Sequence, residues 1–449
     1  MIQVQPFVDE GLGNSAYLVD IGDGRALVID PPRYVEPMRA AAVERGLTIA
    51  FAVETHLHAD FVSGSRELAA HGAGVVGARA AELAFPHRPL DDADELDLGG
   101  LTLRAIATPG HTPEHLSYLL LDGARALGLF SGGVLLPGSV ARTDLIDPAA
   151  TEPLARAMWR SLQTRILTLP DDLVVYPTHG GGSFCSAGTE GEHITTIGRE
   201  RAGNPLLQAP DEDAFVAQLL GSFGSYPTYF ARLRAVNQRG PRVIGQFPAL
   251  AALDLTASDR LVDADAELVD ARPIEAFAAG HIPGSLSIAL RPSFASWLGW
   301  LVEPDRPLLF VLEADQDRLD LVRQALGIGY EQLAGELAGG IETWRTAGRE
   351  LRVTELTSSP GEIEGTRVID VRQESEFEAG HVPGALHLEL GSLPDAVDAA
   401  HGRTTMICAH GERAMTAASL AERNAHRPRV FLGGTEHWAR SARRPLDRS

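Results

Sequence analysis

Cysteine is scarce in this chain of 449 residues, which contains only Cys185 and Cys408. The two cysteines lie far apart in the sequence, so they cannot supply the disulfide framework that stabilises small secreted domains. Each thiol therefore either has a chemical role or is a small buried apolar group.

A basic excess and a long apolar run are also missing. The formal net charge is −21, whereas surfaces that bind nucleic acid or anionic membranes need positive charge. No apolar run approaches the roughly 20 residues of a membrane span, and the first residues, MIQVQPFVDEGLG, lack the pattern of a signal peptide. We expect a cytoplasmic protein that acts on small molecules, with no nucleic-acid partner and no membrane partner.

The remaining composition is that of a globular protein with several domains. The chain is too long for one core, and 44% of it is apolar and 22% charged. Over the first 120 residues, short β-type runs alternate with helical patterns, which indicates α/β layers. The stretch RGPRVIGQFPAL at 239–250 predicts a boundary after the first domain.

An internal repeat follows this boundary. DARPIEAFAAGHIPGSLSIAL (270–290) and DVRQESEFEAGHVPGALHLEL (370–390) lie 100 positions apart and share most of their glycine, histidine and proline positions. The later segments GGIETW and GGTEHW also match. We therefore predict three domains, at 1–240, 260–352 and 362–449.

The first domain contains a pattern of candidate metal ligands. ETHLHADF places His56, His58 and Asp60 at alternating positions, which an extended chain aims to one side. His111 in TPGHTPEH and His179 in VVYPTHGGG each follow an apolar run, at the strand-to-loop edge where functional groups collect. The pattern predicts that these five residues form a metal site.

The motifs THLHAD, PGHTPEH, FSGGVLL, ARTDL and YPTHGGG resemble, in this order, those of the metallo-β-lactamase superfamily. They look most like the motifs of the persulfide dioxygenases, which carry a mononuclear iron. The resemblance covers about half the chain and implies an αββα sandwich. In that superfamily a histidine directly after the aspartate helps to hold a second metal, but Phe61 stands there and has no lone pair to donate. We expect one metal per chain, Fe(II), with zinc as the alternative.

One ligand of the family is missing from this sequence. The resemblance implies two histidine ligands, His56 and His111, and a carboxylate from the third position of a T-G-D motif. The matching residues here are SGG, so Gly133 occupies the carboxylate position and cannot bind a metal through a side chain. We expect Gly133→Asp to increase iron retention, because it would restore two histidines and one carboxylate.

Another group must then complete the coordination sphere. His58, Asp60, His179 or a water molecule could do so. Asp60 is preferred by ligand type, because it keeps a set of two histidines and one carboxylate.

A second motif of the first domain concerns the substrate. ARTDL resembles the family segment that holds the thiol carrier of the persulfide, with Arg142 and Asp144 as the matching residues. An arginine suits a carrier with carboxylates, such as glutathione, because its fork binds them bidentately. The alternative is a structural Arg–Asp pair. For Cys185, in GGSFCSAG, an inert buried thiol is the first interpretation and a site-lining thiol the second.

The third domain resembles an active rhodanese. CAHGERA matches the family's C-x-x-G-x-R loop, with Cys408 as nucleophile and Arg413 as a positive charge beside it. Such a loop aims backbone N–H groups at one sulfur and favours thiolate and persulfide forms. We interpret Asp370, Arg372 and His381 as framework residues of the same family.

The middle domain has the framework without the nucleophile. Its matching strand runs into Leu312 and Glu313 near the cysteine position, and no cysteine occurs from 186 to 407. It resembles the inactive rhodanese-like domains that accompany active ones. The predicted fold class is therefore an α/β metallo-β-lactamase sandwich followed by two rhodanese-like α/β domains.

Three functions remain open. The first is oxidation of a low-molecular-weight persulfide by O2 to sulfite at the metal, coupled to rhodanese transfer of sulfur between persulfide, sulfite and thiosulfate in sulfide detoxification. The second is a zinc hydrolase of thioesters or lactones fused to a sulfurtransferase, with His56, His58 and His111 on the metal. The third is a non-catalytic scaffold that serves the rhodanese. The resemblance and a helical segment at 211–236 are consistent with a homodimer or tetramer.

Overall fold

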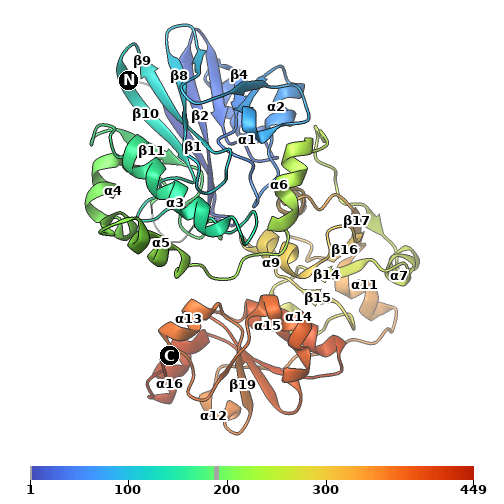
Figure 1. Ribbon diagram of the computed structural model, residues 1–449. Helices are drawn as coiled ribbons and strands as arrows, with labels where there is room; N and C mark the ends of the chain where they lie inside the picture. The colour runs from blue at the N-terminus through green and yellow to red at the C-terminus, as the bar shows by residue number, and fades with distance from the viewer. Residues whose placement is uncertain (1–2, 187–191, 449) are drawn as a thin grey trace. The chain divides into compact units, whose positions relative to one another are not determined.

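Two β-sheets face each other in the first part of the chain (Figure 1). The structure is a computed structural model that describes residues 3–186 and 192–448. The first sheet contains, in spatial order, β1 (Val4–Asp9), β2 (Asn14–Gly22), β3 (Arg25–Ile29), β4 (Thr48–Val53), β5 (Gly74–Ala78) and β6 (Arg88–Leu90). The second contains β12 (Thr195–Thr196), β11 (Val174–Pro177), β10 (Arg125–Gly132), β9 (Leu116–Asp122), β8 (Thr102–Ala107) and β7 (Glu95–Asp97).

The apolar residues of these strands alternate between two cores. In β2, Tyr17 and Val19 belong to the core between the sheets, whereas Ala16 and Leu18 pack under the outer helices. This alternation is expected, because successive strand residues point to opposite faces. Each fully buried branched side chain contributes about 1.5 to 3 kcal/mol relative to an exposed one.

Helices cover the outer face of each sheet, which confirms the predicted αββα sandwich. The first sheet packs against α1 (Glu36–Glu44) and α2 (Ser65–Ala70). The second packs against α3 (Thr151–Ser161), α4 (Ile197–Gly203) and α5 (Glu212–Leu220). A further helix, α6 (Phe230–Arg239), donates hydrogen bonds to the loop that follows β4.

Parallel pairing brings several strand ends to one edge. β3 pairs in parallel with β4, and β10 with β11. The residues that directly follow β3, β4 and β11 are Asp30, Glu54 and Thr178. The loops with His56, His58 and Asp60 and with His179 begin at these carboxyl ends, where sites of α/β sheets are usually built, and the loop with His111 follows β8.

The second part of the chain contains two parallel sheets of the same topology. The first has the order β13 (Ala252–Leu253), β17 (Leu333–Leu337), β16 (Leu308–Val311), β14 (Glu267–Asp270), β15 (Leu286–Ser287). The second has the order β18 (Leu356–Thr357), β22 (Arg429–Phe431), β21 (Thr404–Ile407), β19 (Arg367–Asp370), β20 (Leu386–His387). Identical strand order is what the repeat in the sequence predicts.

Helices accompany each of these sheets. The first repeat contains α7 (Leu255–Asp263), α8 (Ile274–Ala279), α9 (Phe294–Leu301), α10 (Arg318–Gly327) and α11 (Gly340–Thr346). The second contains α12 (Pro360–Ile363), α13 (Glu374–Ala379), α14 (Leu393–Ala396), α15 (Glu412–Arg423) and α16 (Gly434–Ala442).

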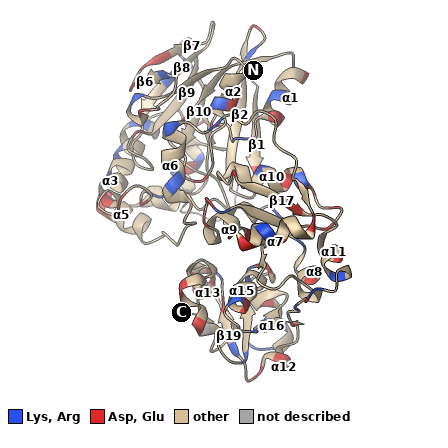
Figure 2. Cartoon of the chain, turned by 90° about the vertical axis from the view of Figure 1, so that its right-hand side faces the viewer, with Lys and Arg blue, Asp and Glu red and all other residues tan. Residues whose placement is uncertain are grey.

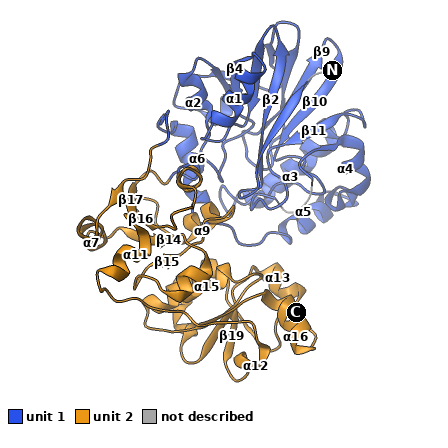
Figure 3. Cartoon of the chain, turned by 180° about the vertical axis from the view of Figure 1, so that it is seen from behind, with its two compact units in different colours: residues 1–247, 326–329 blue, residues 248–325, 330–449 orange. Residues whose placement is uncertain are grey.

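The chain divides into two units by its contacts (Figure 3). Unit 1 comprises residues 1–247 and 326–329, and unit 2 comprises residues 248–325 and 330–449. Both repeats therefore belong to unit 2, apart from residues 326–329 of the first repeat, which are grouped with unit 1. The positions of acidic and basic residues are spread along the chain (Figure 2). In the described ranges, no helix has the length and apolar character needed to cross a membrane.

Candidate functional site

The five predicted metal ligands lie together in unit 1. His56, His58 and Asp60 come from the loop after β4, His111 follows β8, and His179 follows β11. Each is at most 3% exposed. Their ligand atoms, with those of Asp30, form overlapping groups in which all atoms lie within 4.8 Å of one another: His56, His111 and His179; Asp30, His56 and His58; His58, Asp60 and His179.

Two histidines of the first group have a defined tautomer. His111 Nδ1 donates to the carbonyl oxygen of Arg142 at 2.6 Å. His56 Nδ1 lies 2.8 Å from the Thr55 hydroxyl, which itself donates to the Asp30 carboxylate at 2.7 Å and so accepts from the imidazole. In both rings the proton sits on Nδ1, and Nε2 keeps a free lone pair.

His179, the third histidine of this group, also has its proton on Nδ1. His179 Nδ1 donates to Asn14 Oδ1 at 3.0 Å and lies 3.3 Å from a carboxylate oxygen of Asp60. Its Nε2 faces His56 Nε2 at 3.2 Å. Two nitrogen ligands of one metal ion are about 2.8 to 3.4 Å apart, as bond lengths near 2.0 to 2.1 Å and right-angle to tetrahedral geometry require. The spacing fits two ligands of one ion.

The electrostatics of the cluster agree with this role. Burial lowers the pKa of His111 to about 3, and the neighbouring His179 adds to the effect. Burial, followed by the other histidines, lowers the pKa of His56 well below its usual value. Both rings are neutral at physiological pH, as metal ligands must be. The residues present therefore fit a metal ion.

Asp60 is a buried, ionised carboxylate of the cluster, and its role as a metal ligand stays a prediction. Burial alone would raise its pKa, but His179 and then His58 lower the pKa of Asp60 below its usual value, so the carboxylate is ionised. Both of its oxygens are buried and lack a hydrogen-bond partner among the described residues. Asp60 groups with His58 and His179, whereas His179 rather than Asp60 groups with His56 and His111.

Gly133 cannot receive the missing carboxylate. Its N–H donates to His115 Nε2 at 2.9 Å. A Cβ at position 133 would lie 2.7 Å from Cδ2 of His111 and 2.9 Å from the Cβ of Ala141, closer than real Cβ atoms approach. The expectation that Gly133→Asp restores the family triad is therefore corrected, because the added side chain would displace the ring of His111.

Two carboxylates hold the Nε2 atom of His58. Its Nε2 lies 3.0 Å from Glu54 and 3.3 Å from Asp30. Burial would lower the pKa of His58, but these carboxylates raise it to about 10. Nδ1 is buried and has no hydrogen-bond partner in the described part of the chain; with the pKa of His58 raised, this nitrogen can bind a metal only after the ion displaces its proton.

The apolar residue after Asp60, Phe61, packs against a predicted metal ligand. Its buried ring stacks on His58 with 4.2 Å between the ring centroids. The position that holds a second metal ligand in relatives therefore supports the His58 ring instead. One metal per chain stays a prediction.

The sequence analysis missed several residues that shape the site. Asp30 and Glu54 follow apolar strands directly, so the strand-end signal that selected the histidines could also have found them. Glu114 accepts a hydrogen bond from Leu57 N and forms a two-pronged ion pair with Arg234 of α6, with both distances 2.8 Å. Nothing in the sequence connects α6 with a loop so far away.

Asn237 of α6 and Tyr229, which directly precedes this helix, hold the backbone of the ligand loop. Asn237 donates to the carbonyl oxygens of His58 and Phe61, and Tyr229 donates to that of Asp60. The backbone of the ligand loop is thus held in place independently of any metal.

The contacts of Arg142 and Asp144 favour the structural alternative. Arg142 is 4% exposed and donates to both oxygens of Asp144 at 2.6 and 2.8 Å. Its remaining N–H groups donate to the carbonyl oxygens of Phe184 and Gly224. The guanidinium is engaged by the protein itself, so the predicted role in binding the thiol carrier is not supported by these contacts.

Cys185 is fully buried near Asp60. Burial, followed by the Asp60 carboxylate, raises the pKa of the Cys185 thiol well above its usual value. Its backbone carbonyl accepts from Arg142 N at 2.8 Å. A thiol in these surroundings stays protonated at neutral pH, which favours the inert interpretation.

The second predicted site lies in unit 2, where β21 meets α15. Cys408 is 1% exposed, and its Sγ accepts a hydrogen bond from Gly411 N at 3.0 Å. Arg413 is held by Glu376 of α13 through two hydrogen bonds of 2.5 and 2.8 Å. Glu376, which the sequence analysis missed, orients the cation next to the thiol.

The same place in the first repeat is apolar. β16 ends at Val311 as β21 ends at Ile407, so Leu312 takes the place of Cys408. Each strand end accepts an equivalent hydrogen bond, from Ala271 N and Val371 N respectively. Asp370 and Arg372, interpreted above as framework residues, form an ion pair, and Asp270 and Arg272 form the equivalent pair in the first repeat.

Comparison with known proteins finds two protein families in this chain. Residues 9–179 match the metallo-beta-lactamase superfamily, and residues 255–347 and 354–441 match the rhodanese-like domain. Over 202 residues the chain is 32% identical to the mitochondrial persulfide dioxygenase ETHE1 of Homo sapiens, covering 44% of this chain and 72% of the human protein.

Relatives named as a hydrolase and as a metallo-beta-lactamase also match the chain. A hydroxyacylglutathione hydrolase of Brucella anthropi is 31% identical over 181 residues, which cover 40% of this chain and 65% of the hydrolase. A solved metallo-beta-lactamase structure from Staphylococcus aureus superposes with a TM-score of 0.67 at 28% identity, covering 75% of this chain and 99% of that chain. The chain belongs to the persulfide dioxygenase family of the metallo-beta-lactamase superfamily, and two rhodanese-like domains follow its dioxygenase-related unit.

Proposed function

We propose that unit 1 oxidises a low-molecular-weight persulfide to sulfite at a mononuclear iron centre, and that Cys408 then transfers sulfane sulfur. The observation that carries the proposal is the pairing, in one chain, of a persulfide-dioxygenase-related unit that has a buried three-histidine cluster with a Cys408 loop of rhodanese type. Both chemistries share persulfide and sulfite, so fusion raises the local concentration of a common intermediate.

His56, His111 and His179 would hold the metal through Nε2, with His58 Nδ1 as a further donor. When bound, the iron supplies Lewis acidity and open positions for a sulfur anion and oxygen. The chain's own contribution is orientation: the Thr55–Asp30 pair fixes the His56 ring, and Asn14 and Asp60 fix that of His179. Such outer partners typically change metal affinity by about 10- to 100-fold when they are removed.

Cys408 would act by two displacements. Its thiolate attacks the outer sulfur of a persulfide, the S–S bond of that persulfide breaks, and the carrier thiol leaves as a thiolate. Sulfite then attacks the outer sulfur now on Cys408, which forms thiosulfate and returns the cysteine thiolate. The Gly411 N–H and the positive charge of Arg413 stabilise the anionic sulfur in both steps.

A zinc hydrolase of thioesters or lactones is the second candidate. Three neutral histidines suit zinc, and hydroxyacylglutathione hydrolases are among the relatives. In that case Asp60, ionised and next to His179, would receive a proton from the attacking water. A non-catalytic unit 1 is the third candidate, and metal content separates all three.

The test is elemental analysis of anaerobically purified protein, followed by an oxygen-electrode trace on addition of glutathione persulfide. The expected result is about one iron per chain, oxygen uptake and sulfite as product. His179→Ala should abolish both iron and uptake, whereas His71→Ala, an exposed histidine outside the cluster, should change neither. Bound zinc with hydrolysis of a glutathione thioester would favour the second candidate, and a metal-free, inactive protein the third.

A further inference from the structure

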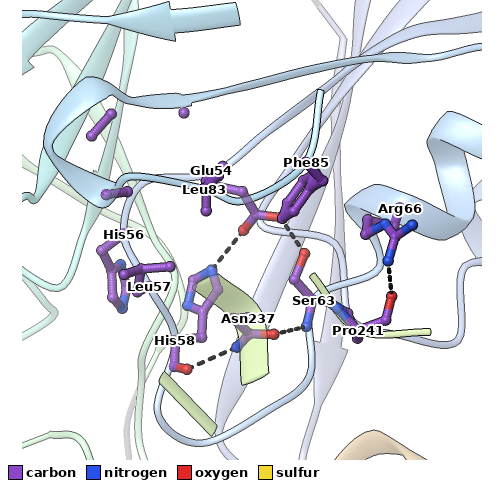
Figure 4. Close-up of a pocket in the computed structure, with 13 residues that line it drawn as sticks. Glu54, His56, Leu57, His58, Ser63, Arg66, Leu83, Phe85, Asn237 and Pro241 are labelled. Carbon is purple, nitrogen blue, oxygen red and sulfur yellow. Dashed lines mark hydrogen bonds and ion pairs between the residues drawn. The ribbon is translucent and has the colours of Figure 1, made fainter. Parts of the chain in front are cut away.

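A small cavity lies directly behind the predicted metal ligands of unit 1 (Figure 4). It has a volume of about 20 Å³, and its wall includes the rings of His56 and His58. Water needs about 10 to 15 Å³ by this kind of measure, so the space suits one small molecule. Most of the wall is apolar and comes from Leu57, Ala78, Ala81, Leu83, Phe85 and Pro241.

The carboxylate in the wall is already satisfied. Glu54 Oε1 accepts from the hydroxyl groups of Ser63 and Ser65, and its Oε2 lies 3.0 Å from His58 Nε2. The Ser63 hydroxyl also accepts from Ser65 N at 3.0 Å. These polar atoms face each other and have little capacity left for a guest.

The amide in the wall is satisfied as well. Asn237 donates to the carbonyl oxygens of His58 and Phe61 at 2.8 and 2.9 Å, and it accepts from Ser63 N at 2.9 Å. Arg66 donates to the carbonyl oxygens of Gly240 and Pro241. Buried water typically makes about three hydrogen bonds, and among the buried side-chain polar atoms of the described wall only His58 Nδ1 lacks a partner. The cavity therefore favours an apolar guest.

The wall of the cavity runs from the buried ligand loop to residues nearer the surface of unit 1. His56, Leu57 and His58 form its buried inner end, whereas Leu83 and Phe85 are only half-buried. Figure 4 shows His56 and Leu57 on one side and Arg66 and Pro241 on the other. A small molecule in this space lies next to the histidines without passing the polar Asp60–His179 side of the site.

We propose that this cavity is a binding site for O2 on its way to the metal centre. The inference rests on the proposed function, because only a dioxygenase needs such a site. Dioxygen is small, uncharged and a poor hydrogen-bond acceptor, so an apolar cavity concentrates it relative to water and excludes the anionic persulfide. The persulfide must then approach from another side.

Krypton, an apolar atom close in size to O2, tests the cavity without any turnover. Crystals of the full-length protein are pressurised with krypton, and its anomalous signal is located. The expected result is a krypton atom between Leu57, Ala81 and Phe85. An ordered water in that position without krypton would overturn the proposal.

Gly77→Ala supplies the matching variant. A Cβ at position 77 would lie 3.3 Å from Leu83 Cδ1 and 3.9 Å from the Cβ of Glu54, so the methyl group enters the cavity at low cost. The control is Gly74→Ala on the same strand, whose Cβ would make an ordinary contact of 3.5 Å with Phe51 outside the cavity. Gly77→Ala should remove the krypton signal, and Gly74→Ala should retain it.

The kinetic readout is the KM for O2. Gly77→Ala should raise it by at least about threefold, while kcat at saturating O2 and the KM for persulfide stay within about twofold. Loss of krypton with an unchanged KM for O2 would overturn the proposal. A wild-type enzyme that binds krypton but takes up no oxygen would overturn the proposed function and the oxygen role together, and would leave only an apolar gas site.

Discussion

At the scale of single residues, the metal centre depends on which nitrogen of each histidine is free. In His56, His111 and His179 the Nδ1 atom is engaged, so all three Nε2 atoms are available together. We predict that His179→Ala lowers bound iron to less than about a tenth of the wild-type content, because a three-ligand site loses a direct donor. Elemental analysis after dialysis measures this content.

Asp60→Asn, compared with His179→Ala, tests whether Asp60 binds the metal directly. It should lower metal affinity by about 10- to 100-fold without abolishing binding, because Asp60 orients His179 and need not bind the ion itself. If His179→Ala keeps its iron and Asp60→Asn loses it completely, the ligand set is the two-histidine, one-carboxylate set predicted from the sequence.

Gly133 gives a second prediction at this scale. Gly133→Ala and Gly133→Asp should both lower iron content, because even a Cβ would lie 2.7 Å from the His111 ring. Iron content and the thermal unfolding midpoint of both variants are the measurements. A gain of iron in Gly133→Asp alone would show that the ring moves aside and that the carboxylate binds.

His115 shows how the site responds to pH. It accepts from Gly133 N, and burial, followed by His111, lowers the pKa of His115 to about 3. Because this folded-state pKa lies below the usual value near 6.5, the unfolded chain binds more protons below that pH. Stability of the metal-free protein should therefore fall as the pH falls from 7 to 5, by up to about 1.4 kcal/mol per pH unit for each such histidine.

Urea unfolding at pH 7 and pH 5 measures this slope. His115→Gln should reduce it, because a glutamine oxygen can accept the same N–H and does not titrate in this range. Equal stability at the two pH values would contradict the assignment of a neutral buried His115.

At the scale of elements, one helix of the second repeat, α15, makes several hydrogen bonds to the first repeat. On α15, the Thr416 hydroxyl donates to Ser287 O at 2.7 Å, and Ser419 Oγ accepts from Ser287 N at 3.1 Å. Glu422 lies 3.1 Å from His281 Nε2. Since α15 begins next to the Cys408 loop, the silent repeat supports the helix that positions the nucleophile.

The repeat supplies an internal control for this contact. His281 Nδ1 faces Phe277 O and His381 Nδ1 faces Phe377 O, but only His281 has a carboxylate partner among the residues described. We predict that Glu422→Gln lowers the unfolding free energy of the full chain by about 1 to 3 kcal/mol, because His281 loses a charge-assisted hydrogen bond. His381→Gln should cost clearly less than His281→Gln in urea unfolding.

The pH dependence of this contact has a definite sign. Burial would raise the pKa of Glu422, but His281 and Arg352 lower it below its usual value of 4.5. Its contribution is therefore present above about pH 4.5 and is lost as the pH falls through the folded-state pKa. A stability difference between wild type and Glu422→Gln that persists at pH 3 would contradict this account.

The motifs and the repeat could be predicted from the sequence, whereas the contacts between distant elements could not. The histidines and the Cys408 loop follow local motifs, and two sheets of equal strand order follow from the 100-residue repeat. The role of α6 and the contact of α15 with the first repeat depend on side chains that meet across more than 100 residues. No local period or motif carries such information, because it is created only when the elements pack.

At the scale of the whole molecule, the order of domains suggests two reactions in one chain, and Cys408→Ser separates them. Serine is nearly isosteric, but its hydroxyl stays protonated at neutral pH and forms no stable persulfide. Supplied with persulfide and oxygen, the wild type should accumulate thiosulfate, whereas the variant should accumulate sulfite. Oxygen uptake should remain within about twofold of wild type, because the metal ligands lie in unit 1 and are unchanged.

The silent repeat provides the control for this separation. Leu312 occupies the place of Cys408, but α10 begins at Arg318 whereas α15 begins at Glu412, so the loop of the first repeat is longer and lacks the C-x-x-G-x-R spacing. The double variant Cys408→Ser with Leu312→Cys should therefore still fail to form thiosulfate, because the new thiol lacks the N–H and cation that the Gly411–Arg413 segment supplies to Cys408. Thiosulfate from Cys408→Ser alone, or a loss of oxygen uptake together with sulfur transfer, would show that Cys408 is not an independent nucleophile and that the two reactions are not separable.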